Sequence, residues 1–389
     1  MKPLSTKFLK FLIVSAFLII AFLAFNSGII NTFAQDNNEQ KKATITKIYT
    51  GKCSLDSTND CNKASIIIDS PGNNLQNAIE AEVNLNTYED YEVYGKYSVG
   101  DLINVKKTGA DGYTLVNPSR DSNFLLLFIV FFVFAIAVGK AKGFRSIIAL
   151  TSSTLVILLG LIPLFVKYPS YILPIGFIGV LVVYIINQLI GHGFSKLSYL
   201  SILSASVTFI LALAFSYFVS GVFKITGFGD DNAVFVAQEV TQRLNLSINL
   251  GDVFIIGLLF GLAGAVDDVN VTQIHSVKEF CELKEDIGFA ELYQKSMKIG
   301  TSHMVSIINT LFLAYVGAAL PTIMLFGLLD QHPLELISRE DLTEEILRTL
   351  IASAGLILAI PLSTLLAIST YIKKPTKLMD FVNSILRTR

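Results

Sequence analysis

The chain has 389 residues, of which 52% are hydrophobic and only 16% charged, and its formal net charge is −1. Soluble domains carry about 25% charged residues, so this composition excludes an ordinary soluble globular protein and favours a membrane protein. The balanced charge, without a basic patch, gives no indication of a nucleic-acid partner.

Apolar segments of spanning length recur along the chain. A helix needs about 17–25 residues to cross roughly 30 Å of hydrocarbon, and in lipid the backbone must satisfy its own hydrogen bonds. The segments are therefore predicted to be helices, namely an N-terminal segment followed by seven core transmembrane helices. They lie at 8–25, 124–139, 146–166, 171–190, 199–222, 253–271, 303–329 and 346–372.

Residues 1–35 are predicted to be a signal peptide or an anchor helix. The apolar run is flanked by lysines and is followed by Thr32-Phe33-Ala34, which fits a signal-peptidase site. Cleavage and retention as an anchor remain equal alternatives. Either way, this segment directs the export of the residues that follow it.

Residues 36–120 differ in kind and are predicted to form an exported β-rich domain. Alternating apolar residues at 43–49, 65–69, 78–85 and 102–107, separated by turn signals, favour five or six short strands. This size suits a small barrel of the OB type. Cys53 and Cys61 lie in this oxidising environment and are predicted to form a disulfide, with two free thiols as the alternative.

The lysine and arginine distribution predicts the orientation of the helical domain, residues 121–375. With a cytoplasmic amino terminus, sixteen lysines and arginines fall on the inner side and five in the short outer loops. The even helix count returns the carboxyl terminus to the cytoplasm, where residues 376–389 form a basic tail. The sequence thus predicts a multi-pass protein of the cell membrane with residues 36–120 outside the cytoplasm.

A pair of carboxylates, Asp267 and Asp268, interrupts the segment 253–271. Each costs about 2.5–3.5 kcal/mol on membrane-insertion scales unless it is compensated. Gly257, Gly261 and Gly264 share a helix face with Asp268, and this spacing is typical of helix-packing glycines. Either the pair faces a cavity or partners, or it is a solvated helix end at the inner surface.

Candidate partners follow in the next helix. His303, Ser306 and Thr310 recur at helical spacing with Asn309 beside them, and antiparallel neighbours bring His303 to the same end as the carboxylates. We therefore expect Asp267, Asp268 and His303 to lie in contact, directly or through one water. A helix cap or interface role for His303 is the alternative. The predicted polar centre, an ion or proton site, comprises Asp267, Asp268, Asn270, Thr272, Gln273, His275, His303, Ser306, Asn309 and Thr310.

Signatures of enzymes and cofactors are missing. Asp267, Asp268, His275 and His303 have ligand chemistry, but no HExxH or CxxC spacing accompanies them. There is no phosphate loop and no nucleophile elbow. The sequence therefore predicts neither metal nor cofactor, and it disfavours an enzyme.

Four segments resemble the YibE/YibF-like family of bacterial multispanning membrane proteins. They are 139–143 (GKAKG), 191–195 (GHGFS), 261–273 (GLAGAVDDVNVTQ) and 300–321, which begins GTSH. An Asp is common before the motif histidine of the family, where this chain has Ser302. The resemblance implies an integral membrane protein with an exported β-rich head, and it implies no particular substrate.

Two functions are therefore predicted for this chain. Polar residues on glycine-lined helices, with prolines in or beside the spans, favour a transporter or permease for an unknown small solute or ion. The alternative is a non-transporting scaffold or assembly factor whose exported domain binds an envelope protein or a second copy. A cavity that reaches Asp267 and Asp268 would favour the transporter, and a solid bundle the scaffold.

Overall fold

The computed structural model describes residues 40–52, 60–68, 79–84, 97–108, 112–328 and 338–372. The chain divides into two compact units between Lys140 and Ala141. The predicted signal or anchor segment and the basic tail lie outside the described residues. So does Cys53, and nothing is described of the Cys61 side chain, so the disulfide stays a prediction.

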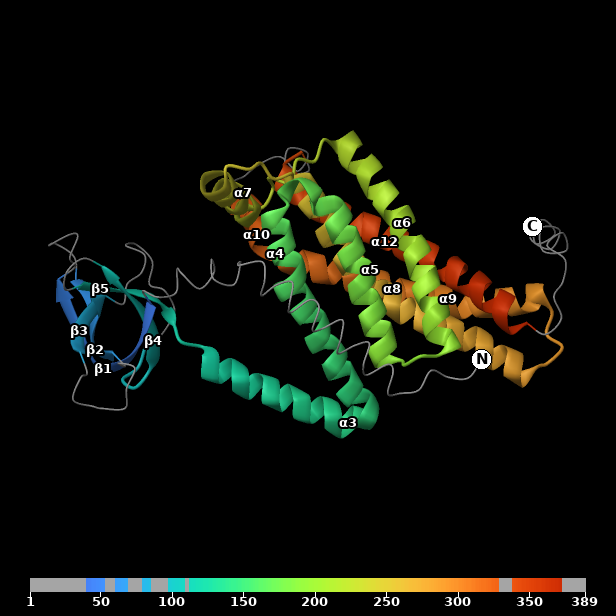
Figure 1. The fold of residues 1–389 in the computed structure, drawn as a ribbon, viewed down its shortest axis with the longest axis horizontal. Coiled ribbons are helices and arrows are strands. Elements are labelled where there is room, and N and C mark those ends of the chain that lie inside the picture. Colours follow the sequence, from blue (N-terminus) through green and yellow to red (C-terminus); the bar gives the residue numbers. More distant parts are fainter. Residues whose placement is uncertain are drawn as a thin grey trace. The chain divides into compact units, whose positions relative to one another are not determined.

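The first unit contains a five-stranded antiparallel sheet, shown from blue to cyan in Figure 1. Its strands are paired in the order β3-β2-β1-β4-β5, and the two edge strands β3 and β5 also contact each other. The strands are β1 (Gln40–Lys52), β2 (Asp60–Ile68), β3 (Ile79–Asn84), β4 (Leu102–Thr108) and β5 (Gly112–Pro118). The four segments of alternating residues, at 43–49, 65–69, 78–85 and 102–107, each overlap an observed strand.

Alternation of side chains builds the core of this sheet. Successive residues of a strand point to opposite faces, so Ala64, Ile66 and Ile68 of β2 all reach one buried side. In β1, Ala43 and Ile45 join them, and the pairing register with β2 shifts between Ile45 and Lys47. The shift lets the strand bend, as in a β-bulge.

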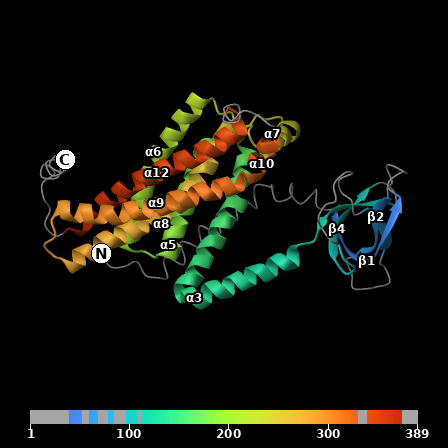
Figure 2. The same cartoon turned by 180° about the vertical axis from the view of Figure 1, so that it is seen from behind.

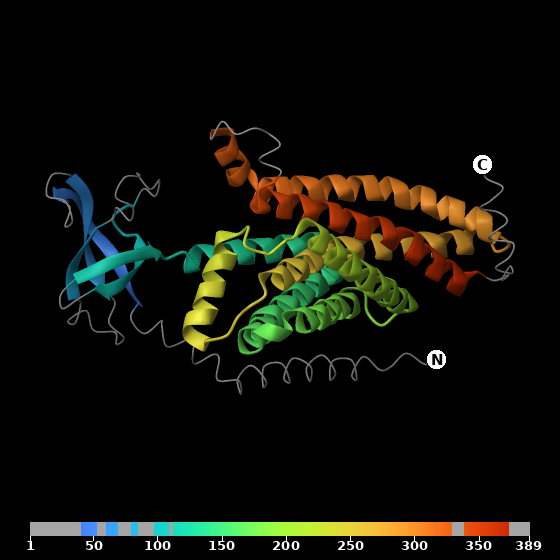
Figure 3. The same ribbon diagram turned by 90° about the horizontal axis from the view of Figure 1, so that it is seen from above.

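Long apolar helices form the second unit and the end of the first (Figures 2 and 3). Six helical runs within the described residues are long and apolar enough to cross a membrane. The first run comprises α3 (Asp121–Val156), the π-turn Ile157–Leu161 and α4 (Ile162–Lys167). The second run joins the turn Pro169–Tyr171 to α5 (Ile172–Gly191). The remaining four runs are single helices, namely α6 (Lys196–Phe223), α8 (Leu250–Leu283), α9 (Phe289–Ala318) and α12 (Glu340–Tyr371).

The first of these runs contains two predicted spans, 124–139 and 146–166. Its apolar span, Asn123–Lys167, has 45 residues and is about 68 Å long at 1.5 Å per residue, roughly twice the thickness of the hydrocarbon. The helical geometry breaks at Lys140, which has φ 49° and ψ −129°. The run is therefore long enough for two crossings.

Helix α8 is the centre of the bundle. It packs against α5, α6, α9 and α12, and side chains such as Leu258, Leu259 and Leu262 are fully buried. These residues form one continuous apolar core with α5, α6 and α12. In contrast, Phe128, Phe131 and other large apolar side chains of α3 are exposed, as expected for a surface that faces lipid.

Two shorter helices connect the long ones. The amphipathic α7 (Asp231–Leu244) is capped by Asp230, whose carboxylate accepts a hydrogen bond from the amide of Asn232 at 2.8 Å. After α9, the chain continues as α10 (Leu320–Leu328).

The residues between the predicted spans 253–271 and 303–329 are mostly helical. Helix α8 extends to Leu283 and α9 begins at Phe289, which leaves a turn of only five residues, 284–288. Glu291 accepts from Lys284 and Lys295 at 2.8 Å, and Leu292 packs into a small apolar cluster with residues of α8 and α12. The two helices therefore form a hairpin that extends beyond the predicted spans.

Candidate functional site

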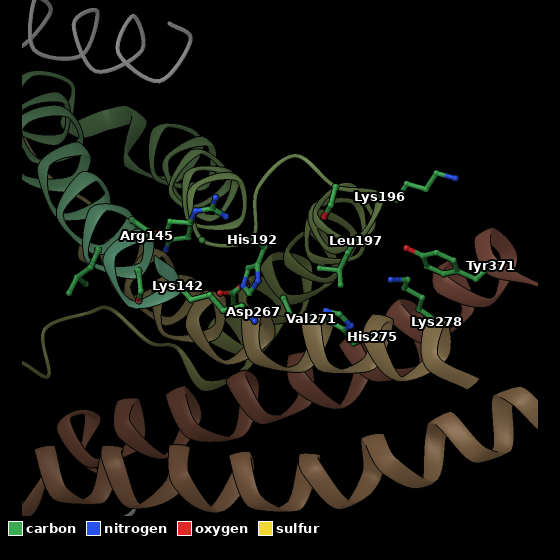
Figure 4. Close-up of a pocket in the computed structure, with 16 residues that line it drawn as sticks. Lys142, Arg145, His192, Lys196, Leu197, Asp267, Val271, His275, Lys278 and Tyr371 are labelled. Atoms are coloured by element: carbon green, nitrogen blue, oxygen red, sulfur yellow. The ribbon is translucent and has the colours of Figure 1, made fainter. Parts of the chain in front are cut away.

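A cavity of about 990 Å³ opens at the end of the bundle where α5 ends and α6 begins (Figure 4). The predicted topology places this end on the cytoplasmic side. The lining residues come from α3, the end of α5 with the α5–α6 turn, α6, α8 and α12. They are Lys142, Arg145, Ser146, Ala149, Leu150, Asn187, Gly191, His192, Ser195, Lys196, Leu197, Asp267, Val271, His275, Lys278 and Tyr371.

One face of α8 supplies one wall. Asp267, Val271, His275 and Lys278 all line the cavity, and their spacing of four, four and three residues keeps them on one side of a helix. Figure 4 shows Asp267 and Val271 close to His192, with His275 and Lys278 farther along α8. Helical periodicity thus places three polar side chains and one apolar side chain along the same side of α8.

The turn between α5 and α6 supplies another part of the wall. Helix α5 ends at Gly191, and Gly193 adopts φ +77°, a left-handed conformation that favours glycine. Ser195 then caps α6, since its hydroxyl accepts from the amide of Ser198 at 3.2 Å. This short turn presents His192 and Ser195 to the cavity.

Asp267 connects the cavity to a buried chain of polar side chains. Gln188 Nε2 on α5 donates a hydrogen bond to Asp267 Oδ1 and lies 3.3 Å from the hydroxyl of Tyr184. That hydroxyl lies 2.8 Å from Ser201 Oγ on α6. Gln188, Tyr184 and Ser201 are all buried, and their hydrogen bonds offset the cost of burying polar groups in an apolar interior, although Gln188 Oε1 has no hydrogen-bond partner among the described residues.

Asn270 extends this chain across α8 and α6. Its Nδ2 lies 3.4 Å from the Tyr184 hydroxyl and 3.4 Å from the carbonyl oxygen of Ser201. Its Oδ1 accepts from Ser204 Oγ at 3.2 Å. A continuous row of hydrogen-bonding groups therefore runs from the cavity at Asp267 to Ser204. We call the row Asp267, Gln188, Tyr184, Ser201, Asn270 and Ser204 the polar chain.

His192 reports the electrostatic character of the cavity. Its partial burial lowers its pKa below the ordinary value of 6.5, and the neighbouring charges of His275 and Lys142 lower it further. Asp268 acts in the opposite direction. Positive charge therefore outweighs the nearby carboxylate at this imidazole.

The structure divides the predicted polar centre between faces of α8. Asp267, Asn270 and His275 belong to the cavity and the polar chain, whereas Asp268 is exposed. Gln273 turns toward α9 and α12, where Nε2 donates to the Ser296 carbonyl at 2.7 Å and approaches Thr364 Oγ1 at 2.8 Å. The carbonyl oxygen of Thr272 accepts a bond from Ser276 within α8.

The residues proposed on α9 are not joined to the polar chain. His303 is half-buried, and its Nε2 has no hydrogen-bond partner among the described residues, so it forms no direct bond to Asp267 or Asp268 through this nitrogen. The contact of His303 with the carboxylates stays a prediction. Ser306, Asn309 and Thr310 are exposed, and the Thr310 hydroxyl donates to the carbonyl of Ser306 within the helix.

Only one of the three predicted packing glycines approaches another side chain closely. A Cβ at Gly261 would lie 2.5 Å from the hydroxyl of Tyr315, whereas one at Gly264 would meet nothing within 4 Å. At Gly257 the nearest atom is 4.0 Å away. Other glycines also make tight contacts, for example Gly176, where a Cβ would lie 2.6 Å from the Ile256 side chain.

A second polar cluster lies at the other end of the bundle, where α6 ends and α12 begins. Glu340 accepts from the amides of Thr226 at 2.5 Å and Gly227 at 2.9 Å, and Glu344 accepts from the amide of Gly229 at 3.2 Å. These bonds fix the loop after α6 against α12.

Sequence reasoning missed Gln188 and Tyr184 in particular. These two residues are four positions apart in an otherwise apolar helix. Their neighbour Asn187 accepts a hydrogen bond at Oδ1 from Ser153 Oγ at 2.6 Å. That pair of polar residues at helical spacing was an available signal. For a metal, the described part of the chain offers no group of three or more histidines, cysteines or carboxylates that could hold one.

These features define a multi-pass α-helical membrane protein with a polar cavity at one end of its bundle. The chain belongs to the YibE/F-like protein family, whose model matches residues 127–373, which confirms the resemblance seen in the sequence. No curated protein and no solved structure matches the chain.

Three of the four segments that carry the family resemblance contribute to the cavity. The segment 139–143 supplies Lys142, 191–195 supplies His192 and Ser195, and 261–273 supplies Asp267 and Val271. Segments that are far apart in the sequence thus converge on one site.

Proposed function

We propose that the protein is a transporter or permease of the cell membrane, with the cavity as its cytoplasmic vestibule. One observation carries the proposal: the cavity reaches Asp267, which begins the polar chain into the bundle. Buried polar groups are costly in a membrane and commonly mark pathways for solutes or ions. A scaffold would be stable with a solid apolar bundle and would not require the polar chain.

The proposal includes the finer topology. Seven core helices cross the membrane, and the first two are the halves of the 45-residue span. The carboxyl terminus lies in the cytoplasm, and so does the amino terminus if residues 1–35 are retained as an anchor. The exported sheet is a barrel of the OB type, supported by its five strands and by the contact between its edge strands. At the outer end, Glu340 and Glu344 hold the loop after α6, and this contact has to loosen when the bundle opens outward.

A test of access from both sides separates a transporter from a scaffold. A transporter exposes its central polar residues alternately to each side. With the native cysteines replaced by serine, Ser204→Cys at the inner end of the polar chain changes only one atom. We expect a charged, membrane-impermeant thiol reagent to label it from the outside of cells, and Asn187→Cys in the cavity to be labelled in inverted vesicles.

Ala352→Cys provides the control, because Ala352 is fully buried in the apolar core of α12 and should stay unlabelled from either side. Labelling of Asn187→Cys alone, with Ser204→Cys protected on both sides, would mean a one-sided cavity in a fixed bundle. That result would reject the transporter and leave the scaffold.

A further inference from the structure

The lining of the cavity is strongly unbalanced in charge. Four lysine and arginine residues line it, together with the hydrogen-bonding imidazoles of His192 and His275. Asp267 is the only carboxylate among the lining residues. The four cationic residues are Lys142, Arg145, Lys196 and Lys278. Clefts lined by one sign of charge between low-dielectric walls concentrate ions of the opposite sign.

Most of this positive charge lacks a protein partner. Lys278 lies 3.6 Å from Glu282, one turn along α8. Among the described residues, no ion pair joins Lys142, Arg145 or Lys196 to a carboxylate. Asp267 accepts its hydrogen bond from Gln188 rather than from any of them. The cationic groups are therefore available to a ligand.

The start of α6 adds to the same site. Lys196 and Leu197 are the first two residues of this 28-residue helix, and both line the cavity. The first amide groups of a helix have no acceptor within it, and they carry the positive end of the helix dipole. Phosphate groups bind at such positions, which here lie among lysine side chains.

We propose that the cavity binds a phosphate-bearing ligand, with Lys142, Arg145 and Lys196 as its main contacts. The inference names the ligand class of the vestibule described above and in that sense rests on the proposed function. Arginine and lysine supply charge-assisted hydrogen bonds to phosphate oxygens. The cavity far exceeds one phosphate in volume, and Leu150 and Val271 line it as well, so the ligand carries an organic or apolar body.

This chemistry has two sources, namely a soluble phosphate compound from the aqueous phase and the headgroup of an anionic lipid. Purified full-length protein in nanodiscs of neutral phosphatidylcholine tests the first, with inorganic phosphate exchanged for chloride at constant ionic strength. Nanodiscs that contain phosphatidic acid test the second. Binding is measured as the increase in melting temperature and, for the lipid, by native mass spectrometry.

The cavity variant is Lys142→Gln/Arg145→Gln, and the matched control is Lys295→Gln/Lys298→Gln on α9. Both remove two positive charges from the same predicted face, but Lys295 and Lys298 do not line the cavity. Loss of two charge-assisted hydrogen bonds weakens binding by at least about tenfold. Lys142→Arg should retain binding, which separates loss of charge from a failure to fold.

Binding of phosphate that the cavity variant loses and the control keeps supports the proposal with a soluble source. The same pattern with phosphatidic acid alone supports a lipid headgroup. Equal loss in both variants, or no binding in either arm, overturns it. Phosphate binding together with protection of Ser204→Cys on both sides would reject transport and leave the binding site standing.

Discussion

Removing the hydroxyl of Tyr184 tests whether the polar chain stabilises the bundle. Tyr184→Phe keeps the ring, including its edge-to-face contact with Phe209 at 5.4 Å, so no apolar cavity forms. The substitution removes the 2.8 Å bond to Ser201 and two longer contacts, at 3.3 Å from Gln188 and 3.4 Å from Asn270. These bonds join three different helices.

The expected loss of stability depends on the hydrogen bonds that each partner of Tyr184 keeps. Hydrogen bonds between helices in membranes contribute about 0.6 kcal/mol on average and up to about 1.7. Gln188 still donates to Asp267, and Asn270 still reaches the carbonyl of Ser201, so neither donor is orphaned completely. We therefore expect Tyr184→Phe to lower the free energy of unfolding by about 1–2 kcal/mol.

The measurement is unfolding in detergent with increasing sodium dodecyl sulfate, for which Tyr217→Phe is the control. Tyr217 lies on α6 with 66% of its surface exposed, and its change should stay within about 0.5 kcal/mol. A double-mutant cycle of Tyr184→Phe with Ser201→Ala should give a coupling of about 0.6–1.7 kcal/mol. Equal stability of the two tyrosine variants and zero coupling would refute the reasoning.

Three further predictions concern charge, packing and pH. Asp267→Asn should abolish complementation of a deletion strain without changing membrane insertion, because asparagine keeps the bond from Gln188 and loses the charge, whereas the exposed Asp268→Asn should complement fully; the reverse pattern would contradict the site. Gly176→Ala should lower the melting temperature, because its Cβ would overlap a side chain of α8, while Gly264→Ala should leave it unchanged; equal melting temperatures would contradict the packing. Burial lowers the pKa of His192 in the folded protein. As the pH falls below about 6.5, this histidine therefore binds a proton in the unfolded chain before it does so in the folded protein. The free energy of unfolding decreases with falling pH until the pH is below the pKa of the folded state. His192→Gln should therefore lose less melting temperature than the wild type between about pH 7.5 and 5.5, and parallel curves would exclude the effect.

The sequence by itself determined the class of protein and the elements. Runs of apolar residues predict helices in lipid because no other structure satisfies the backbone there, and alternation predicts strands because side chains of a strand point to opposite faces. Ala64, Ile66 and Ile68 follow that rule in β2. The family, too, was evident from short segments that stand in order along the chain.

The sequence predicted a polar centre on α8, at Asp267 and Asn270, and it predicted that His303 on the next helix, α9, contacts the carboxylates. That contact stays a prediction. The partners that the structure shows for Asp267 and Asn270 in the polar chain, Gln188 and Tyr184, lie about eighty residues earlier.

Tertiary structure decided those partners, since helical periodicity tells which residues share a face but not which helix that face meets. Asp267 and Gln273 lie on the same helix, yet one turns toward α5 and the other toward α9 and α12. The rotation of α8 is set by the packing of its apolar side chains against four helices at once, a property of the assembled bundle. The cavity exists for the same reason, because five separate segments form its walls only after the helices have packed.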